Sequence, residues 1–150
     1  RSKYVVFHFR RNADKVYDVY RFLLDACPDC YFVFVGSTEH EHVPAVPPEG
    51  EGRTLSVVDS YQRGLGLVDV LNVISLASAY VGGRGGLELY AWMSGVPTAN
   101  FFDRVGRLEI RAGWWDKSFW KRNAIPHLFN EQTSPRFVGQ IVLNILQLGP

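Results

Sequence analysis

The 150-residue chain has almost no net charge, no long apolar run and only two cysteines. Its formal net charge of +1 gives no reason to expect nucleic acid as a partner, because such binding normally needs a clustered basic face. No apolar stretch approaches the roughly 20 residues of a membrane-spanning helix, and no signal peptide is visible. The expected location is cytoplasmic, with a membrane-associated or secretory parent protein as the alternative.

Three sequence signatures of nucleotide and metal sites are also missing. The first predicted strand runs into His8-Phe9-Arg10-Arg11 instead of Gly-x-Gly-x-x-Gly, which argues against NAD or FAD. A Gly-Lys-Ser/Thr P-loop is absent, which argues against hydrolysis of ATP or GTP. An Asp-x-Asp pair is absent too, so neither a metal ion nor a cofactor is expected.

The two cysteines, Cys27 and Cys30, stand between a predicted helix and a predicted strand. Redox-active Cys-x-x-Cys pairs lie at a helix start, where the dipole lowers the thiol pKa, whereas this pair follows a helix end. Zinc would need further ligands, and His40 and His42 lie beyond the far end of the next strand, about 16 Å away at 3.3 Å per residue. A structural role is expected, with redox chemistry or zinc as the alternatives.

The chain does contain a regular alternation of strand and helix patterns. Short apolar runs predict buried strands, and apolar residues recurring at three and four positions predict helices. Strands are predicted at Tyr4–Phe9, Tyr31–Val35, Thr54–Val58, Tyr80–Val81 and Thr98–Phe102, and helices at Ala13–Ala26, Leu65–Ala77, Leu87–Ser94 and Pro135–Leu148. This alternation predicts an α/β fold, with a Rossmann-like open, mostly parallel sheet of five or six strands in the order 3-2-1-4-5 and helices on both faces.

The length suits a single domain with a substantial core. The chain begins at Arg1 without Met and enters a predicted strand almost at once. Residues 1–150 are therefore expected to be one domain excised from a longer two-domain protein.

A glycine-rich turn, Gly82-Gly83-Arg84-Gly85-Gly86, joins the fourth strand to the next helix. Backbone N–H groups and the dipole at a helix start favour an anion such as phosphate; the alternative is that the glycines only permit a tight turn. The predicted strand order brings this turn to Arg10-Arg11 at the switch point of the sheet, where such folds bind ligands. Two guanidinium groups facing a helix start would form a pyrophosphate site.

The run from Gly82 to Glu88, followed by Ser94-Gly95-Val96-Pro97-Thr98, resembles the C-terminal, donor-binding domain of GT-B glycosyltransferases. In that family the helix start binds the phosphates of a nucleotide sugar, and a Glu on the helix often holds the ribose hydroxyls. The family places this Glu five residues before the glycine that ends the helix, where this chain has Tyr90; Glu88 stands seven residues before it.

A narrower resemblance concerns His8-x-Arg10-Arg11-x-x-Asp14, which is similar to the His-x-Arg-Arg-x-Asp motif of α1,2/α1,6 and protein O-fucosyltransferases, with one extra residue. In those enzymes an arginine of the motif grips the GDP pyrophosphate, so this resemblance implies GDP-fucose as the donor. The alternatives are a hydrogen-bonded core histidine at position 8, and a helix cap or a partner of Arg11 at Asp14.

The resemblance implies the donor half of a glycosyltransferase that transfers a sugar from its nucleotide to an acceptor hydroxyl. The catalytic candidates are Arg10 and His8, and Ser37 and Tyr61 follow strands where a base and ribose would lie, although both could simply be turn residues. The predicted donor-binding residues are Arg10, Arg11, Ser37, Tyr61, Gly83, Arg84, Gly85, Gly86, Leu87 and Glu88.

An aromatic and cationic segment between the last strand and the final helix contains Trp114, Trp115, Phe119 and Trp120. We expect it to contact a missing N-terminal acceptor-binding domain, with sugar stacking or peripheral membrane contact as alternatives. That other domain would supply the catalytic base, so this domain alone would bind donor without turnover. The alternative functions are a nucleotide-sugar epimerase of the same architecture and a non-catalytic interaction domain.

Overall fold

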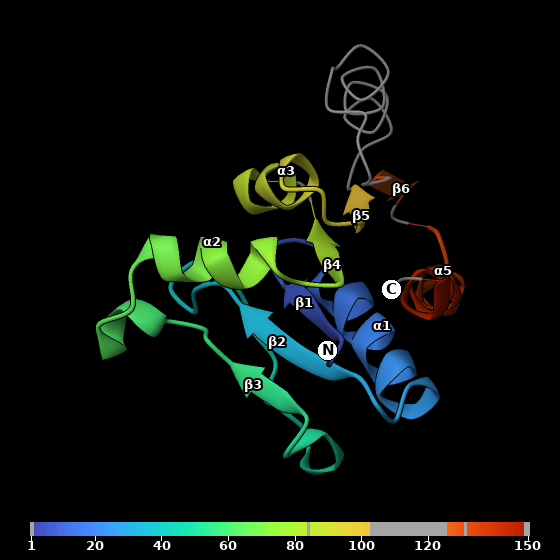
Figure 1. The fold of residues 1–150 in the computed structure, drawn as a ribbon, viewed down its shortest axis with the longest axis horizontal. Helices are drawn as coiled ribbons and strands as arrows, with labels where there is room; N and C mark the ends of the chain where they lie inside the picture. The colour runs from blue at the N-terminus through green and yellow to red at the C-terminus, as the bar shows by residue number, and fades with distance from the viewer. Residues whose placement is uncertain (1, 84, 103–125, 131, 149–150) are drawn as a thin grey trace.

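The computed structural model describes residues 2–83, 85–102, 126–130 and 132–148. Within these residues, six parallel strands form one sheet in the order β3-β2-β1-β4-β5-β6 (Figure 1). The strands are β1 Tyr4–His8, β2 Tyr31–Val35, β3 Thr54–Ser56, β4 Ala79–Gly83, β5 Thr98–Phe102 and β6 Pro126–Asn130. The predicted Rossmann-like α/β fold and the strand order 3-2-1-4-5 are confirmed, and β6 extends the sheet beyond β5.

Helices cover both faces of the sheet. On one face α1 (Ala13–Ala26) lies beside α5 (Pro135–Leu148), and on the other α2 (Leu67–Ser75) lies beside α3 (Gly86–Met93), as Figure 1 shows. Two short 3₁₀ turns, η1 Pro48–Gly50 and η2 Ser60–Arg63, flank β3. Because every strand is parallel, all the strand carboxyl ends meet at one edge of the sheet, where the connections to the helices begin.

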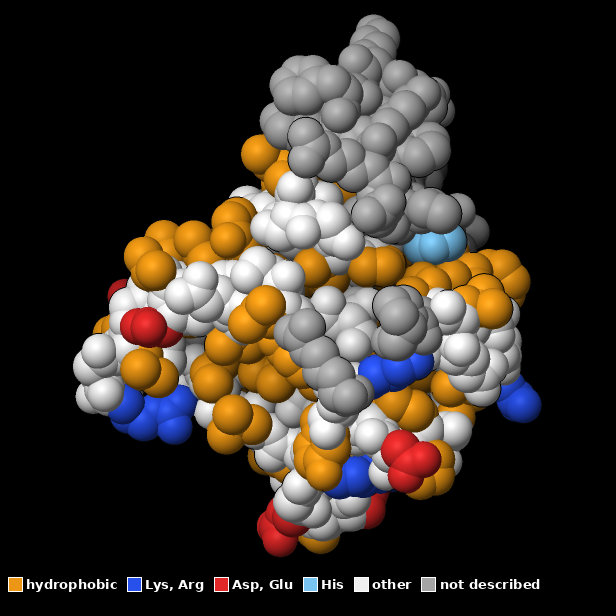
Figure 2. Space-filling model, in the orientation of Figure 1, with side chains coloured by type: hydrophobic (Ala, Val, Ile, Leu, Met, Phe, Trp, Pro, Cys, Tyr) orange, Lys and Arg blue, Asp and Glu red, His pale blue; other side chains and the backbone are white. Residues whose placement is uncertain are grey.

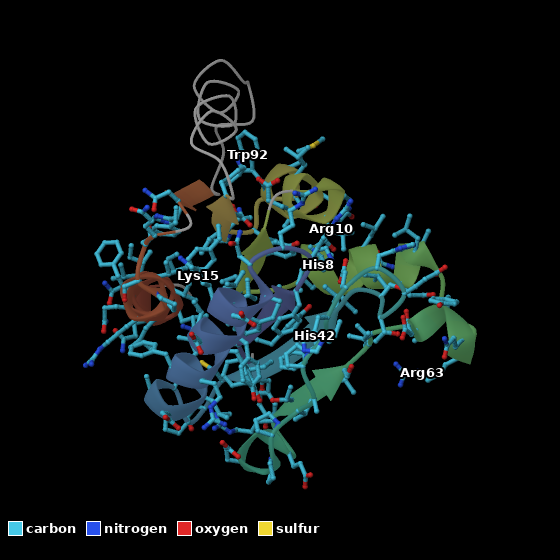
Figure 3. All side chains as sticks on the ribbon, turned by 180° about the vertical axis from the view of Figure 1, so that it is seen from behind. His8, Arg10, Lys15, His42, Arg63 and Trp92 are labelled. Carbon is cyan, nitrogen blue, oxygen red and sulfur yellow. A yellow bond between two sulfur atoms is a disulfide. The ribbon has the colours of Figure 1, made fainter. Side chains whose placement is uncertain are left out.

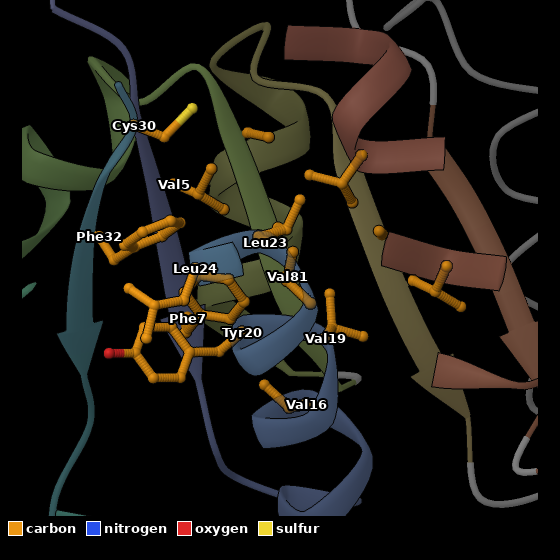
Figure 4. Close-up of a cluster of buried hydrophobic side chains, with 14 of the residues drawn as sticks. Val5, Phe7, Val16, Val19, Tyr20, Leu23, Leu24, Cys30, Phe32 and Val81 are labelled. Atoms are coloured by element: carbon orange, nitrogen blue, oxygen red, sulfur yellow. The ribbon is translucent and has the colours of Figure 1, made fainter. Parts of the chain in front are cut away.

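The larger core lies between the sheet and the α1–α5 pair (Figure 4). Tyr20 of α1 packs edge-to-face against Phe34 of β2 at 4.8 Å between ring centroids, and its hydroxyl is 2.9 Å from the Thr54 hydroxyl. Such aromatic pairs add about 0.5–1.5 kcal/mol to the burial of their apolar area. Alternate strand residues form this face and are aromatic or branched: Val5, Phe7, Phe32, Phe34, Val81 and Phe101.

The opposite face of the sheet has a smaller core and a partly exposed helix. Val6, Val33 and Tyr80 pack there against Ile74 of α2 and Ala91 of α3. Four apolar residues in and around α2 are exposed: Leu65, Leu67, Val68 and Leu76. Figure 2 shows hydrophobic side chains gathered over α2 and in the area between α2 and the sheet.

Four predicted ranges, at α1, β2, β5 and α5, coincide with the observed elements, while the other five begin or end one or two residues away. The second predicted helix starts at Leu67 instead of Leu65, because the Gly66 N–H donates to the Asp69 carboxylate at 2.8 Å and fixes the first turn there. β3 ends at Ser56, since the chain turns at Asp59, whose φ is 53°.

A disulfide joins Cys27 and Cys30 at the amino-terminal edge of the sheet. Arg53 closes this corner, because its guanidinium donates to the carbonyl oxygens of Leu24 and Cys27 at 2.7 and 2.9 Å. His40 and His42 line a hollow beside the start of α1, which follows the carboxyl end of β1, whereas the cysteines line a hollow at the end of α1. The structure thus agrees with the expected separation of these histidines from the cysteines.

Candidate functional site

A cleft of about 650 Å³ lies at the carboxyl ends of β1 and β2 and at the start of α3. It takes residues from the connections after β1, β2 and β3 and from both helices of that face. Of the residues predicted from the sequence, the cleft brings together His8, Arg10, Ser37, Tyr61, Gly86 and Leu87. Its remaining walls are formed by Gly36, Glu41, Ser60, Leu65, Gly66, Leu67, Val70, Leu71 and Tyr90.

Among the described residues, Arg10 is the cationic side chain that faces the start of α3. Figure 3 shows it at the end of β1, beside His8 and beneath α3. A Cβ built on Gly85 would lie 3.9 Å from Arg10 Nη1, so the guanidinium reaches the turn that opens the helix. The positive charge of Arg10 therefore lies close to the positive end of the α3 dipole.

The glycines of the turn divide into two pairs. A Cβ on Gly82 would lie 3.2 Å from the His8 carbonyl oxygen, and a Cβ on Gly83 would lie 3.3 Å from Arg11 Cβ. At Gly86 such a Cβ would meet no described atom within 4 Å beyond the adjoining residues and the helix's own backbone, and at Gly85 the neighbours are atoms of the Arg10 side chain. The first pair permits close packing of β4 against the end of β1, while the second leaves the helix start open.

Glu88 and Tyr90 lie differently on α3. Glu88 is 1% exposed, and its carboxylate accepts a hydrogen bond from the Gly85 N–H at 3.4 Å, as in a capping box. Tyr90 lines the cleft, one turn into the helix. The position that holds the ribose-binding Glu in the GT-B pattern thus faces the cleft here, and the Glu88 side chain helps to form the helix start.

Arg11 lines a second hollow of about 530 Å³ beside the start of α1. Arg10 and Glu41 line both hollows and so lie between them. Arg11 and Asn12 have positive φ values of 96° and 49°, which turns the chain sharply after β1. Asn12 takes the cap position of α1 and Asp14 lies in its first turn, where a carboxylate suits the dipole.

His8 connects the cleft to the core through two hydrogen bonds. Its Nε2 is 2.9 Å from Glu41 Oε1, and its Nδ1 is 3.0 Å from the Tyr80 hydroxyl. Burial holds the pKa of Tyr80 well above its usual value, the carboxylates of Glu88 and Glu41 raise it further, and Arg10 opposes them. Tyr80 therefore keeps its proton and can donate to Nδ1, which leaves the Nε2–H to donate to Glu41.

This arrangement occupies both ring nitrogens of His8 with protein partners. His8 is 4% exposed, so in this geometry it positions Glu41 and offers no free nitrogen to a ligand. The sequence does not mark Glu41 as a site residue, because Glu41 lies in a polar loop that also contains Glu39, Glu49 and Glu51. Only the folded loop brings its carboxylate to the end of β1.

Part of the cleft lining is apolar. The apolar lining residues come from α2 and the turn before it and from α3: Leu65, Leu67, Val70, Leu71, Leu87 and Tyr90. Tyr61 and Ser37, from the connections after β3 and β2, also line the cleft. A ligand with an anionic part near Arg10 and a flat, apolar part near α2 would match these walls.

Some predicted residues lie outside the part of the chain that the structure describes: Arg84, Trp114, Trp115, Phe119 and Trp120. Among the residues described, no three His, Cys, Asp or Glu side chains gather into a group that could hold a metal ion. Across that same part of the chain, no helix has the length and apolar character needed to cross a membrane.

Comparison of the sequence with models of known protein families and with curated proteins finds no match.

Proposed function

We propose that this chain is the donor-binding domain of a GT-B-like glycosyltransferase, which holds the pyrophosphate of a nucleotide sugar between Arg10 and the start of α3. The observation that carries the proposal is that a guanidinium and an open, glycine-flanked helix start face each other in one cleft. This cleft lies where β1 and β4 are neighbours and their connections lead to opposite faces, which is where open α/β sheets bind ligands.

The other walls of the cleft suit the remaining parts of a nucleotide. The apolar side chains of α2 and the Tyr61 ring offer surfaces against which a base can lie. Tyr90 and Ser37 offer hydroxyl groups that can bind ribose hydroxyls. Within this proposal GDP-fucose is the donor that the His8-x-Arg10-Arg11 motif favours.

The proposed chemical role is stabilisation of the leaving group. As the bond from sugar to diphosphate breaks, negative charge grows on the diphosphate. A fixed guanidinium and the first N–H groups of α3, around Gly86 and Leu87, would stabilise that charge without reorganising. The base that activates the acceptor hydroxyl would come from the other domain.

The test is a calorimetric titration with GDP, UDP, ADP and CMP of the wild type, Arg10→Ala and Gly86→Asp. Arg10→Ala should weaken binding by about tenfold to a hundredfold, the usual effect of losing a charged hydrogen bond of about 1.5–3 kcal/mol. Gly86→Asp should abolish binding, because it adds a negative charge and a side chain to the open helix start. The fold should tolerate it, since Asp in a first helical turn is favourable.

Ser134→Asp is the matched control, because it adds the same charge immediately before α5, far from the cleft along the chain. It should leave affinity unchanged. If none of the four nucleotides binds to a wild-type protein that is folded by circular dichroism, the donor-site proposal fails. The exposed apolar residues of α2 would then favour the interaction domain.

A further inference from the structure

A carboxylate stands beside the proposed anion site, where an anionic ligand alone would not need one. Glu41 lines the cleft together with Arg10. Its side chain is only 7% exposed, so it is not a solvated surface charge. Burying a carboxylate is unfavourable unless hydrogen-bond partners or opposite charges compensate it. Other groups of the fold must therefore stabilise Glu41 at this position.

Three neighbouring segments fix the position of this carboxylate. His8 of β1 holds Oε1, and His8 is itself held by Tyr80 of β4. The Ser37 N–H points at Oε2 from 3.4 Å. Gly36 has a φ of +129°, and a Cβ at this position would overlap Oε2, so only glycine allows the loop to bring Glu41 so close.

The carboxylate still has acceptor capacity. An ionised carboxylate offers about four lone-pair sites. Among the described residues, the Glu41 carboxylate has hydrogen bonds with the His8 ring and, over a longer distance, with the Ser37 N–H. Because Glu41 and Arg10 both line the cleft and the second hollow, a group attached to a diphosphate at Arg10 would lie within reach of Glu41. That group must supply hydrogen-bond donors and must not be anionic.

We propose that Glu41 is a specificity-determining residue that accepts hydrogen bonds from hydroxyls of the group joined to the diphosphate and rejects donors in which that group carries a negative charge. This inference rests on the proposed function and adds the class of the transferred group, which is a neutral, hydroxylated sugar. His8 and Tyr80 act as positioning residues that hold the carboxylate in place.

The experiment is a titration of the wild type with a matched set built on the diphosphate that binds: UDP, UDP-glucose and UDP-glucuronate, or GDP, GDP-mannose and GDP-mannuronate, or ADP, ADP-glucose and ADP-glucuronate. The neutral sugar should bind more tightly than the diphosphate alone. The uronate, which differs by one carboxylate, should bind at least tenfold more weakly than the neutral sugar, because of like-charge repulsion.

Glu41→Gln removes the charge and keeps an amide oxygen to accept from His8. It should reduce the discrimination against the uronate to less than threefold and should not weaken the bare diphosphate. The matched control is Glu39→Gln, which makes the same change in the same loop at an exposed side chain beside His40. This control should discriminate as the wild type does.

Equal wild-type affinities for the neutral sugar and the uronate would overturn the inference while leaving the donor site intact, and this result does not depend on any variant folding. Full discrimination in a folded Glu41→Gln variant would overturn it as well, as would binding restricted to CMP and CMP-sialate, whose sugar is anionic. Failure of every nucleotide to bind would refute the proposed function itself, and this inference with it.

Discussion

Removing the guanidinium of Arg53 is expected to destabilise the corner where α1 ends and β2 begins. Arg53 Nη2 donates to the Leu24 carbonyl at 2.7 Å, and Nη1 donates to the carbonyls of Cys27, Pro28 and Cys30 at 2.9, 3.2 and 3.4 Å. These oxygens include carbonyls of the last helical turn and its cap, which have no partner within the helix. The guanidinium also lies 5.7 Å from the centroid of the Phe32 ring.

The magnitude follows from these contacts. Arg53→Met keeps most of the apolar stem and removes every donor. The two short hydrogen bonds are worth about 1 kcal/mol each, since water can partly replace them, and the cation–π contact adds about 0.5 kcal/mol. The expected loss is therefore about 2.5 kcal/mol, or roughly 5–10 °C in the thermal midpoint for a chain of this size.

Urea unfolding followed by far-UV circular dichroism measures this loss directly. Arg63→Met is the matched control, because Arg63 donates to one carbonyl, that of Ser56 at 3.1 Å, at an exposed position. The control should lose less than about 0.5 kcal/mol, as exposed substitutions usually do. If Arg53→Met and Arg63→Met lose the same stability, the reasoning from the four carbonyl contacts is refuted.

Two further outcomes follow from the disulfide and from a half-buried histidine. Reducing the Cys27–Cys30 disulfide should lower the free energy of unfolding by about 2 kcal/mol, the loop-closure entropy of so short a loop at 25 °C; a Cys27→Ser/Cys30→Ser variant that still responds to reductant would contradict this. Burial lowers the pKa of His127 below its usual 6.5, so folding favours the neutral ring, and the stability present above pH 6.5 should decline as the pH falls toward the lowered value. His127→Gln should flatten that part of a thermal-midpoint profile between pH 8 and 5, and an unchanged profile would exclude His127 as the cause.

The parts of the fold that could be predicted are those set by local sequence. α1 and α5 have one apolar face each and a proline at or near one end, which is enough to fix their bounds at Ala13–Ala26 and Pro135–Leu148. β2 is a short continuous run of apolar residues, as expected of a strand buried on both faces. β6 begins at a proline and follows an irregular aromatic segment, so no periodic pattern marks it as a strand.

The candidate site was predictable only where the strand order determines it. Knowing that β1 and β4 are neighbours places Arg10 beside the turn before α3, and the cleft contains both. The same strand order predicts Arg11 beside Arg10 at this turn, but the backbone turns at Arg11 and Arg11 lines the second hollow. Glu41 could not be found at all, since its place depends on a loop folding back onto His8.

The four glycines before α3 look alike in the sequence, but the fold shows that they have different surroundings. In the sequence Gly82, Gly83, Gly85 and Gly86 look equivalent, and a tight turn would explain them all. In the fold, a side chain at either of the first two would crowd β1 or the turn after it. A side chain at Gly85 would instead meet the Arg10 side chain, and one at Gly86 would enter open space. Close packing therefore explains glycine at positions 82 and 83, but it does not explain glycine at positions 85 and 86. Their open surroundings beside a guanidinium therefore support a ligand at the start of α3 over a purely conformational role.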